Sequence, residues 1–348
     1  MIKKLSELTG TEILNRTLMT WDYQVILQEG AVIKKDYIEK LEEMGITEVS
    51  VRKPETTHEI VILKTEVESM AKQKVKEILG RHTYQHNDEL SKLAKTADNI
   101  ITTILEDDEV IEKVYDIKQR SSDLYEHSIS VCSMATLTAL KMNLDKQNIR
   151  DLGVGCLLHD MGLRYVTVAY EDRKMESFSE KELTEYKKHP IYGFSAIKEE
   201  KWISDISKNI ILHHHERKDG SGYPLKTRDL SIECKIVAVC EAFDEMICGI
   251  ANERSKVYEA VEFLKNASGT LLDKTAVETF LKFTAVYPAG THVVTNEGEI
   301  ATVVRQNPDF QDRPVLRIIK DREGNKVKGD VYKDMVKITN IFIEKVLE

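Results

Sequence analysis

Residues 213–224 read HHHERKDGSGYP. The stretch begins with three successive histidines and ends in a turn that contains Gly222 and Pro224. Imidazole rings bind first-row metals, while glycine permits a positive φ and proline fixes φ, so this loop can bend sharply beside a metal. The stretch therefore indicates one wall of a metal site, and the rest of the fold is expected to bring further metal-binding side chains to it.

The composition is that of an ordinary globular protein with room for two or three domains. The chain has 348 residues, of which 41% are hydrophobic and 31% are charged. A formal net charge of −9 argues against non-specific binding to DNA or RNA polymers. Any phosphate-bearing ligand must therefore be held by local positive charge or by metal ions.

The chain has no apolar run that approaches the ~20 residues needed for a membrane span. Its first residues contain lysines but no apolar segment after them, so we expect a cytoplasmic protein without a membrane span. The cysteines are scattered without a C-x-x-C pair, which favours reduced, buried thiols over disulfides or a zinc ribbon. They are Cys132, Cys156, Cys234, Cys240 and Cys248.

The apolar patterning predicts a mainly α-helical fold with smaller flanking parts. Residues 1–57 alternate short apolar runs with turns, which is typical of a small α+β module. Residues 58–120 have helical spacing and are predicted to connect this module to the centre and to allow two copies to pair. Residues 121–284 are again predicted to be mostly helical. Residues 285–348 are predicted to form a small β-rich tail that a helix around 336–347 closes.

Histidines lie among apolar residues in the central segment. His127 shares one helical face with Leu124, Val131 and similar side chains, which places it on the buried side of its helix. The pair His159-Asp160 follows a short apolar run. Neighbours on a helix point about 100° apart, so these two can bind different metals, or the carboxylate can bridge two ions.

Further along the chain, Glu241 follows the largely apolar run 235–240, which makes it a candidate buried ligand, although a helix-surface glutamate is the alternative. His82 and His86 stand four residues apart in a charged helical region, where a solvated face is the better interpretation. His292 falls in a predicted strand and is not expected to be a ligand.

In this order and spacing, these pieces make residues 121–284 resemble an HD-GYP domain, a branch of the HD metal-dependent phosphohydrolases. The matching pieces are YEHS, LLHDMG, KHP, HHERKDGSGYP and IVAVCEAFDEM, all between residues 125 and 246. The resemblance implies an HD-type helical bundle that holds two or three divalent metal ions, usually iron or manganese. It also implies hydrolysis of the bacterial second messenger cyclic di-GMP, so the expected partner is a cyclic dinucleotide.

Carried over position by position, the resemblance assigns metal ligands, among which His159 and Asp160 form the catalytic pair and Asp160 bridges two ions. Glu241 stands where the family usually has aspartate, and Asp123 stands where members with three metals carry an acidic ligand. Tyr223 is expected to lie against the substrate. The implied ligands are Asp123, His127, His159, Asp160, His189, His214, His215 and Glu241.

The chain departs from the family at the positions whose side chains bind the substrate phosphate. Leu163 replaces the usual lysine, and Arg164 comes one residue late, about 100° around a helix. The family's Asp-Ala-Leu-Thr run becomes Asp244 followed by EMI, and Arg254 is a candidate to compensate.

In the histidine-rich loop, Arg217 and Asp219 are predicted to order the backbone rather than to touch substrate, while His213 lies outside the matching histidine pair. The residues that match the family and those that depart from it are together compatible with three functions. The first is a cyclic di-GMP phosphodiesterase with altered substrate contacts. The second is a phosphohydrolase that acts on another nucleotide or phosphoester, and the third is a non-catalytic signalling module that retains its metals.

Overall fold

The chain divides into two compact units, Met1–His58 and Glu59–Glu348. A computed structural model describes residues 2–8, 12–14, 18–19, 25–27, 31, 33, 35–52, 59–81, 88–106, 113–119, 123–171 and 173–347. The histidine pair at 82 and 86 lies outside these residues.

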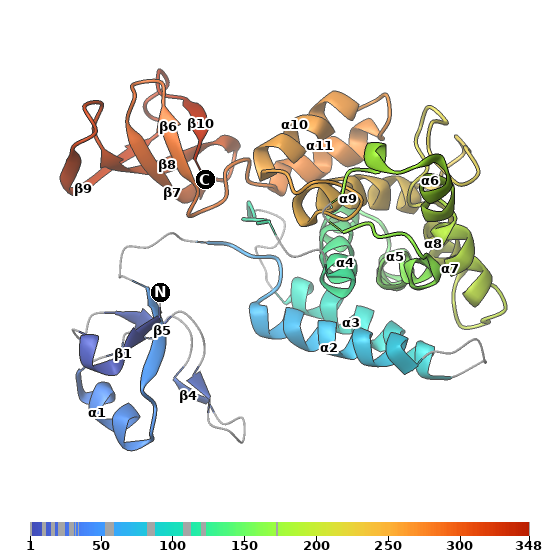
Figure 1. Cartoon of the computed structure of the whole chain (residues 1–348), viewed down its shortest axis with the longest axis horizontal. Coiled ribbons are helices and arrows are strands. Elements are labelled where there is room, and N and C mark those ends of the chain that lie inside the picture. The colour runs from blue at the N-terminus through green and yellow to red at the C-terminus, as the bar shows by residue number, and fades with distance from the viewer. Residues whose placement is uncertain are drawn as a thin grey trace. The chain divides into compact units, whose positions relative to one another are not determined.

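In the first unit, the described residues form small sheets and short helical segments (Figure 1). Strand β5 (Glu48–Arg52) is central to a three-stranded sheet and pairs antiparallel with β1 (Ile2–Lys4) and β2 (Ile13–Leu14). Its other elements are the 3₁₀ helix η1 (Leu5–Glu7), the strand pair β3 (Leu18–Met19) and β4 (Val25–Leu27), and helix α1 (Lys35–Glu43). Alternate residues Val49 and Val51 of β5 enter a separate apolar core, as the two-residue period of a strand requires.

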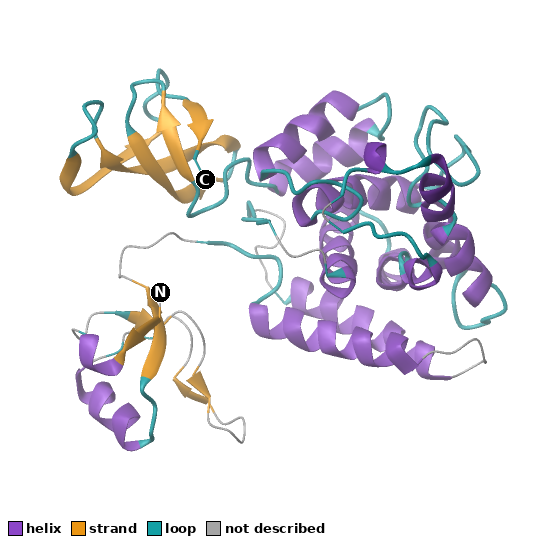
Figure 2. Cartoon of the chain, in the orientation of Figure 1, coloured by secondary structure: helices purple, strands orange, loops and turns teal. Residues whose placement is uncertain are grey.

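The second unit begins with a helical bundle, drawn in purple in Figure 2. Its α-helices are α2 (Thr65–Arg81), α3 (Lys92–Leu105), α4 (Leu124–Lys141), α5 (Lys146–Leu158), α6 (Glu180–Tyr186), α7 (His189–Ile197), α8 (Asp205–His213), α9 (Ile232–Cys248), α10 (Val257–Ala267) and α11 (Lys274–Phe283). Short 3₁₀ helices are η2 (Asp88–Ser91), η3 (Met161–Tyr165) and η4 (Met175–Ser177).

Helices α4, α5, α8 and α9 pack on one another at the centre of the bundle. Their first turns are capped by short polar side chains, since Asp145 accepts backbone N–H groups at the start of α5 and Ser231 does so for α9. Helix α9 ends at Gly249, whose φ of 84° is the left-handed conformation that glycine adopts at low cost. Almost all of α9 is buried, so this helix lies in the core of the bundle. A polar side chain of α9 is therefore stable only where it finds a partner.

Five antiparallel strands follow the bundle, in the spatial order β10-β6-β7-β8-β9. They are β6 (His292–Thr295), β7 (Ile300–Asn307), β8 (Phe310–Lys320), β9 (Lys326–Asp334) and β10 (Ile343–Val346). Val293 pairs with Ala301, and Val303 pairs with Leu316 in the next strand. These four side chains lie in a small core of their own, apart from that of the helices.

Asp116 joins the segment before α4 to the C-terminal sheet. Its buried carboxylate accepts the N–H of Ile60 at 2.8 Å, the N–H of Ala289 at 2.7 Å and the Nε2–H of Gln306 at 2.8 Å. Three donors thus converge on one acceptor group, which satisfies a buried charge that would otherwise be costly.

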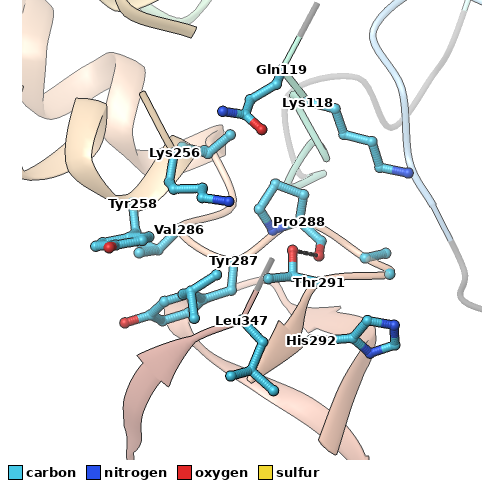
Figure 3. Close-up of a pocket in the computed structure, with 14 residues that line it drawn as sticks. Lys118, Gln119, Lys256, Tyr258, Val286, Tyr287, Pro288, Thr291, His292 and Leu347 are labelled. Carbon is cyan, nitrogen blue, oxygen red and sulfur yellow. Dashed lines mark hydrogen bonds between the residues drawn. The ribbon is translucent and has the colours of Figure 1, made fainter. Parts of the chain in front are cut away.

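A cavity of about 420 Å³ lies between the helices and this sheet. Lys256 and Tyr258, at the start of α10, line it together with Tyr287, Pro288 and other residues before β6 (Figure 3). The Tyr258 and Tyr287 rings are stacked at 6.3 Å between centroids. None of the histidines in the central bundle borders this cavity, so it is distinct from the predicted metal site.

The predicted fold class is confirmed, with a mainly helical body, an N-terminal α+β unit and a C-terminal antiparallel sheet. The expected helix around 336–347 is wrong: residues 343–346 form β10, which pairs with β6 at the edge of the sheet. Local spacing favoured a helix, but the open edge of β6 offers hydrogen bonds that only a strand can use. No described helix is long and apolar enough to cross a membrane.

Candidate metal centre

Five helical segments bring their ends or buried faces to one point in the bundle. Helix α4 contributes His127, and α9 contributes Glu241 from its buried middle. The C-terminal end of α5 leads directly into His159 and Asp160, and α7 starts at His189. The end of α8 delivers His214 and His215, the histidines of the stretch that precedes the glycine-rich turn. All seven side chains are buried.

One group of donors consists of His127, His159, Asp160 and Glu241. The Nε2 atoms of His127 and His159 lie 3.1 and 3.0 Å from Glu241 Oε2. They lie 3.5 and 3.4 Å from Asp160 Oδ2. Two imidazole nitrogens and two carboxylates therefore face the same small volume, as the ligands of one cation would.

A second group adjoins the first and consists of Asp160, His189, His214 and His215. The other oxygen of Asp160, Oδ1, lies 3.3 Å from His189 Nε2 and 3.5 Å from His214 Nε2. Asp160 thus turns one carboxylate oxygen to each group. This is the placement expected of a carboxylate that bridges two metal ions.

Hydrogen bonds to the far nitrogen fix the orientation of three imidazoles. His159 Nδ1 lies 2.6 Å from the carbonyl of Cys156, and His189 Nδ1 lies 2.8 Å from that of Tyr186. His214 Nδ1 likewise contacts the carbonyls at the end of α8. A carbonyl only accepts, so Nδ1 carries the proton in each ring and Nε2 is left to bind a metal.

The donor atoms fit metal ions better than they fit one another. The Nε2 atoms of His189 and His214 are 3.1 Å apart, and with protons on Nδ1 two lone pairs face each other. Asp160 Oδ1, Glu241 Oε2 and His215 Nε2 are buried and have no hydrogen-bond partner among the described residues. A divalent cation in each group removes both penalties, and a mixed set of imidazole and carboxylate ligands suits iron or manganese.

Without metal, the two groups differ in their electrostatics. Burial lowers the pKa of the His159 imidazole, but the carboxylates of Asp160 and Glu241 outweigh burial and raise the pKa to about 10. The same balance, with Glu241 and Asp244 as the main partners, raises the pKa of His127 well above its usual value. In the second group, burial lowers the pKa of His214 to about 4, although the Asp160 carboxylate acts in the opposite direction and raises it.

Two further carboxylates of α9 belong to the centre, although the sequence assigned them no role. Asp244 Oδ2 lies 2.8 Å from His127 Nδ1, and Asp244 Oδ1 accepts the Ser130 hydroxyl at 2.6 Å. Glu245 is buried beside His215, with Oε1 4.0 Å from Nε2. Their spacing of three and four residues from Glu241 was the available signal, because it places all three on neighbouring positions of one helix face.

Asp123 takes a different place from the other predicted ligands. Its carboxylate caps α4 by accepting the backbone N–H groups of Tyr125 and Glu126, and it forms an ion pair of 3.2 Å with Lys72. It belongs to none of the groups of potential metal ligands found in the described part of the chain.

The predicted phosphate contacts also lie apart from the donor groups. The guanidinium of Arg164 donates to the carbonyl of Leu79 at the end of α2, and Arg254 Nε donates to the carbonyl of Cys248 at 3.4 Å. Leu163 is buried in an apolar cluster with Phe178 and other side chains. The position that carries lysine in the resembling family is thus filled by packing rather than by charge.

The loop after α8 places Tyr223 on the metal centre. Its ring stacks on His215 at 4.5 Å between centroids with an interplanar angle of 21°. Arg217 donates to the carbonyls of His214 and Glu216, and Asp219 accepts the N–H and hydroxyl of Ser221.

Gly222 is needed in this loop because a Cβ there would lie 2.5 Å from the carbonyl of His215. Two other histidines lie outside the donor groups. His213 contacts the carbonyl of Asn209, and His292 pairs with the Thr302 hydroxyl in the sheet.

Two parts of the chain match known protein families. Residues 109–276 match the HD domain family, and residues 292–348 match a family described as the KOW domain associated with HD domain. The first match contains both donor groups, and the second covers the C-terminal sheet.

Several bacterial proteins are similar to this chain. A cyclic di-GMP phosphodiesterase of Pseudomonas aeruginosa is 26% identical over 216 residues, which covers 60% of this chain and 51% of that protein. A cyclic di-GMP phosphodiesterase of Thermotoga maritima is 29% identical over 229 residues, which covers 62% of this chain and 57% of that protein. The chain thus spans little more than half the length of these relatives.

A solved structure has the same fold. It is a HDG"Y"P protein from Bdellovibrio bacteriovorus, with a TM-score of 0.54 at 18% identity, and the match covers 80% of this chain and 97% of that one. At this level of identity the likeness concerns the fold alone.

Proposed function

We propose that this chain, which belongs to the HD domain family and is an HD-GYP domain protein, is a metal-dependent phosphodiesterase. The proposed reaction is the hydrolysis of cyclic di-GMP to linear pGpG or GMP. One observation carries the proposal. Two groups of buried donors adjoin each other and share Asp160, which offers one oxygen to each. Such a pair of sites is the arrangement that phosphodiester cleavage by two cations requires.

When bound, iron or manganese ions supply Lewis acidity for the phosphate oxygens and a water molecule that is activated near neutral pH. The protein's part would be to hold such ions beside each other, and Asp160, which follows α5, would offer one carboxylate oxygen to each. The carbonyl and carboxylate partners of the Nδ1 atoms fix the orientation of the imidazole rings. The side chains of the centre therefore need little rearrangement when substrate binds.

We propose that Tyr223 meets the substrate next to the second donor group. Its ring covers His215, and its buried hydroxyl has no hydrogen-bond partner in the described part of the chain. Arg217 and Asp219 hold the loop's backbone from within the loop, which supports a positioning role for both.

Leu163 supports a second candidate, a phosphohydrolase that acts on another nucleotide or phosphoester. An apolar side chain fills the position of the family's phosphate-binding lysine, while Arg164 and Arg254 donate to backbone carbonyls. Phosphate charge is then balanced mainly by the metal ions, and the protein contributes less discrimination for a cyclic dinucleotide. The third alternative, a signalling module without turnover, retains the ions for structure alone.

A substrate panel distinguishes these candidates. The purified chain is reconstituted anaerobically with Fe(II) or Mn(II) and incubated with cyclic di-GMP, other cyclic dinucleotides and simple nucleotide phosphoesters. Preferential release of pGpG or GMP supports the proposal, and faster turnover of another compound replaces it with the second candidate.

The control variants separate loss of the ions from loss of structure. Asp160→Asn should reduce turnover at least about 100-fold, because it weakens both donor groups at once. The matched control Asp151→Asn changes a partly exposed carboxylate of α5, the helix before Asp160, and should leave turnover unchanged.

A further inference from the structure

Glu245 is a buried carboxylate, and one of its oxygens has no hydrogen-bond partner among the described residues. It lies in α9 one turn after Glu241, is only 7% exposed, and its Oε1 makes no hydrogen bond with any residue that the structure describes. The nearest opposite partner is His215 Nε2, at 4.0 Å. No lysine or arginine forms an ion pair with it among the described residues.

This placement is costly unless a positive charge arrives. Glu241 and Glu245 stand four residues apart on one helix, so two buried carboxylates face the same side. Like charges at this spacing repel, and the low dielectric of the interior strengthens the repulsion. A cation between the two carboxylates would convert the repulsion into attraction to a common centre.

Three donor atoms already converge there. One ligand atom from each of His215, Glu241 and Glu245 lies within 4.8 Å of the others. His215 Nε2, Glu241 Oε2 and Glu245 Oε1 are each buried and each lack a hydrogen-bond partner in the described residues. Glu241 also faces His127 and His159 in the first donor group, but His215 Nε2 and Glu245 Oε1 gain a partner only from a group placed between them, as a cation would be.

We propose that His215, Glu241 and Glu245 form a third cation position in the metal centre. It shares the Glu241 carboxylate with the first donor group, just as the first and second groups share Asp160. An imidazole nitrogen binds one ion at a time, so His215 leaves the second group with Asp160, His189 and His214. Three protein ligands with open positions for water or substrate are typical of a catalytic ion.

The chemistry of the donors indicates which cations fit. Two carboxylates and one imidazole form a mostly oxygen set, which suits Mn(II), Fe(II) or a similarly hard divalent ion. Asp123 does not compete for this role, because its carboxylate is engaged with the first turn of α4 and with Lys72. The inference rests on the two-ion centre proposed above, but it does not depend on the substrate.

Metal stoichiometry tests the third position directly. The full chain and its variants are saturated anaerobically with Mn(II) and freed of excess metal. The number of manganese ions per chain is then measured by elemental mass spectrometry. We expect about three ions in the wild type and about two in Glu245→Gln, which keeps the volume of the side chain but removes its charge.

The matched control is Glu233→Gln, a buried glutamate of the same helix whose carboxylate accepts the Asn148 side chain at 3.1 Å. It should keep about three ions. Circular dichroism and thermal melts of both variants verify that the helices are intact. A wild type that saturates at two ions overturns the third position, and so does any count other than two in a folded Glu245→Gln.

These results are independent of the proposed function. A protein with three ions but no hydrolysis of cyclic di-GMP would retain the third position and lose the proposed substrate. A protein with two ions and rapid hydrolysis would do the opposite.

Discussion

Loading the centre with metal at pH 7 should release about two protons per chain from the first donor group. A pKa of about 10 keeps more than about 99% of His159 rings protonated at this pH, and His127 is held protonated by Glu241 and Asp244. A metal ion binds only the neutral imidazole, so each ring must give up its proton. His214, with a pKa of about 4, is already neutral and should release none.

The same reasoning fixes the pH dependence of affinity. With two protons displaced, the apparent dissociation constant of the first group should fall about 100-fold between pH 7 and pH 8. The contribution of His214 to the second group should not change over that interval. In the metal-free protein, the raised pKa of His159 adds stability below its unfolded value of 6.5, and this stability is lost as pH rises through about 10.

Isothermal titration calorimetry in buffers of different ionisation enthalpy measures the number of protons released. His159→Gln should lower that number by about one, whereas the matched control His213→Gln should leave it unchanged, since this ring lies outside both groups. Metal binding at pH 7 without proton release would refute the assignment of His127 and His159 as charged rings held by carboxylates.

Two further predictions concern stability, measured by chemical denaturation. Gly162→Ala should cost at least about 2 kcal/mol and lower metal content, because its Cβ would collide with the carbonyl of His189, whereas Gly153→Ala meets only ordinary contacts and should change stability by less than about 1 kcal/mol. Asp116→Ala should cost roughly 3 kcal/mol or more, because three buried donors lose one acceptor, while the exposed Asp330→Ala should stay within about 0.5 kcal/mol. Equal effects of a variant and its control would contradict either prediction.

The helical body and the convergence of its histidines could be predicted because each signal is local. A histidine on an apolar helix face, such as His127, must be buried, and a buried imidazole needs a partner. An acid after an apolar run, such as Glu241, obeys the same rule. The order of these pieces along the chain then indicated which of them meet.

Other features depend on contacts between distant segments. Glu245 was noted only as a departure from the family, although its spacing from Glu241 placed both on one helix face. Asp123 had the right spacing from His127, but at the first turn of α4 the free backbone N–H groups and Lys72 engage its carboxylate. The strand at 343–346 depends on β6 as its neighbour, which helical spacing alone does not reveal.

The most direct test of the proposed function is a single assay on metal-loaded protein. The chain, reconstituted anaerobically and carrying at least two Mn(II) ions by elemental analysis, is mixed with cyclic di-GMP, and the nucleotides are separated by chromatography. We predict the appearance of linear pGpG or GMP, dependent on metal and absent in Asp160→Asn. Intact cyclic di-GMP after prolonged incubation with protein that holds its ions would contradict the assignment of this centre as a cyclic di-GMP phosphodiesterase.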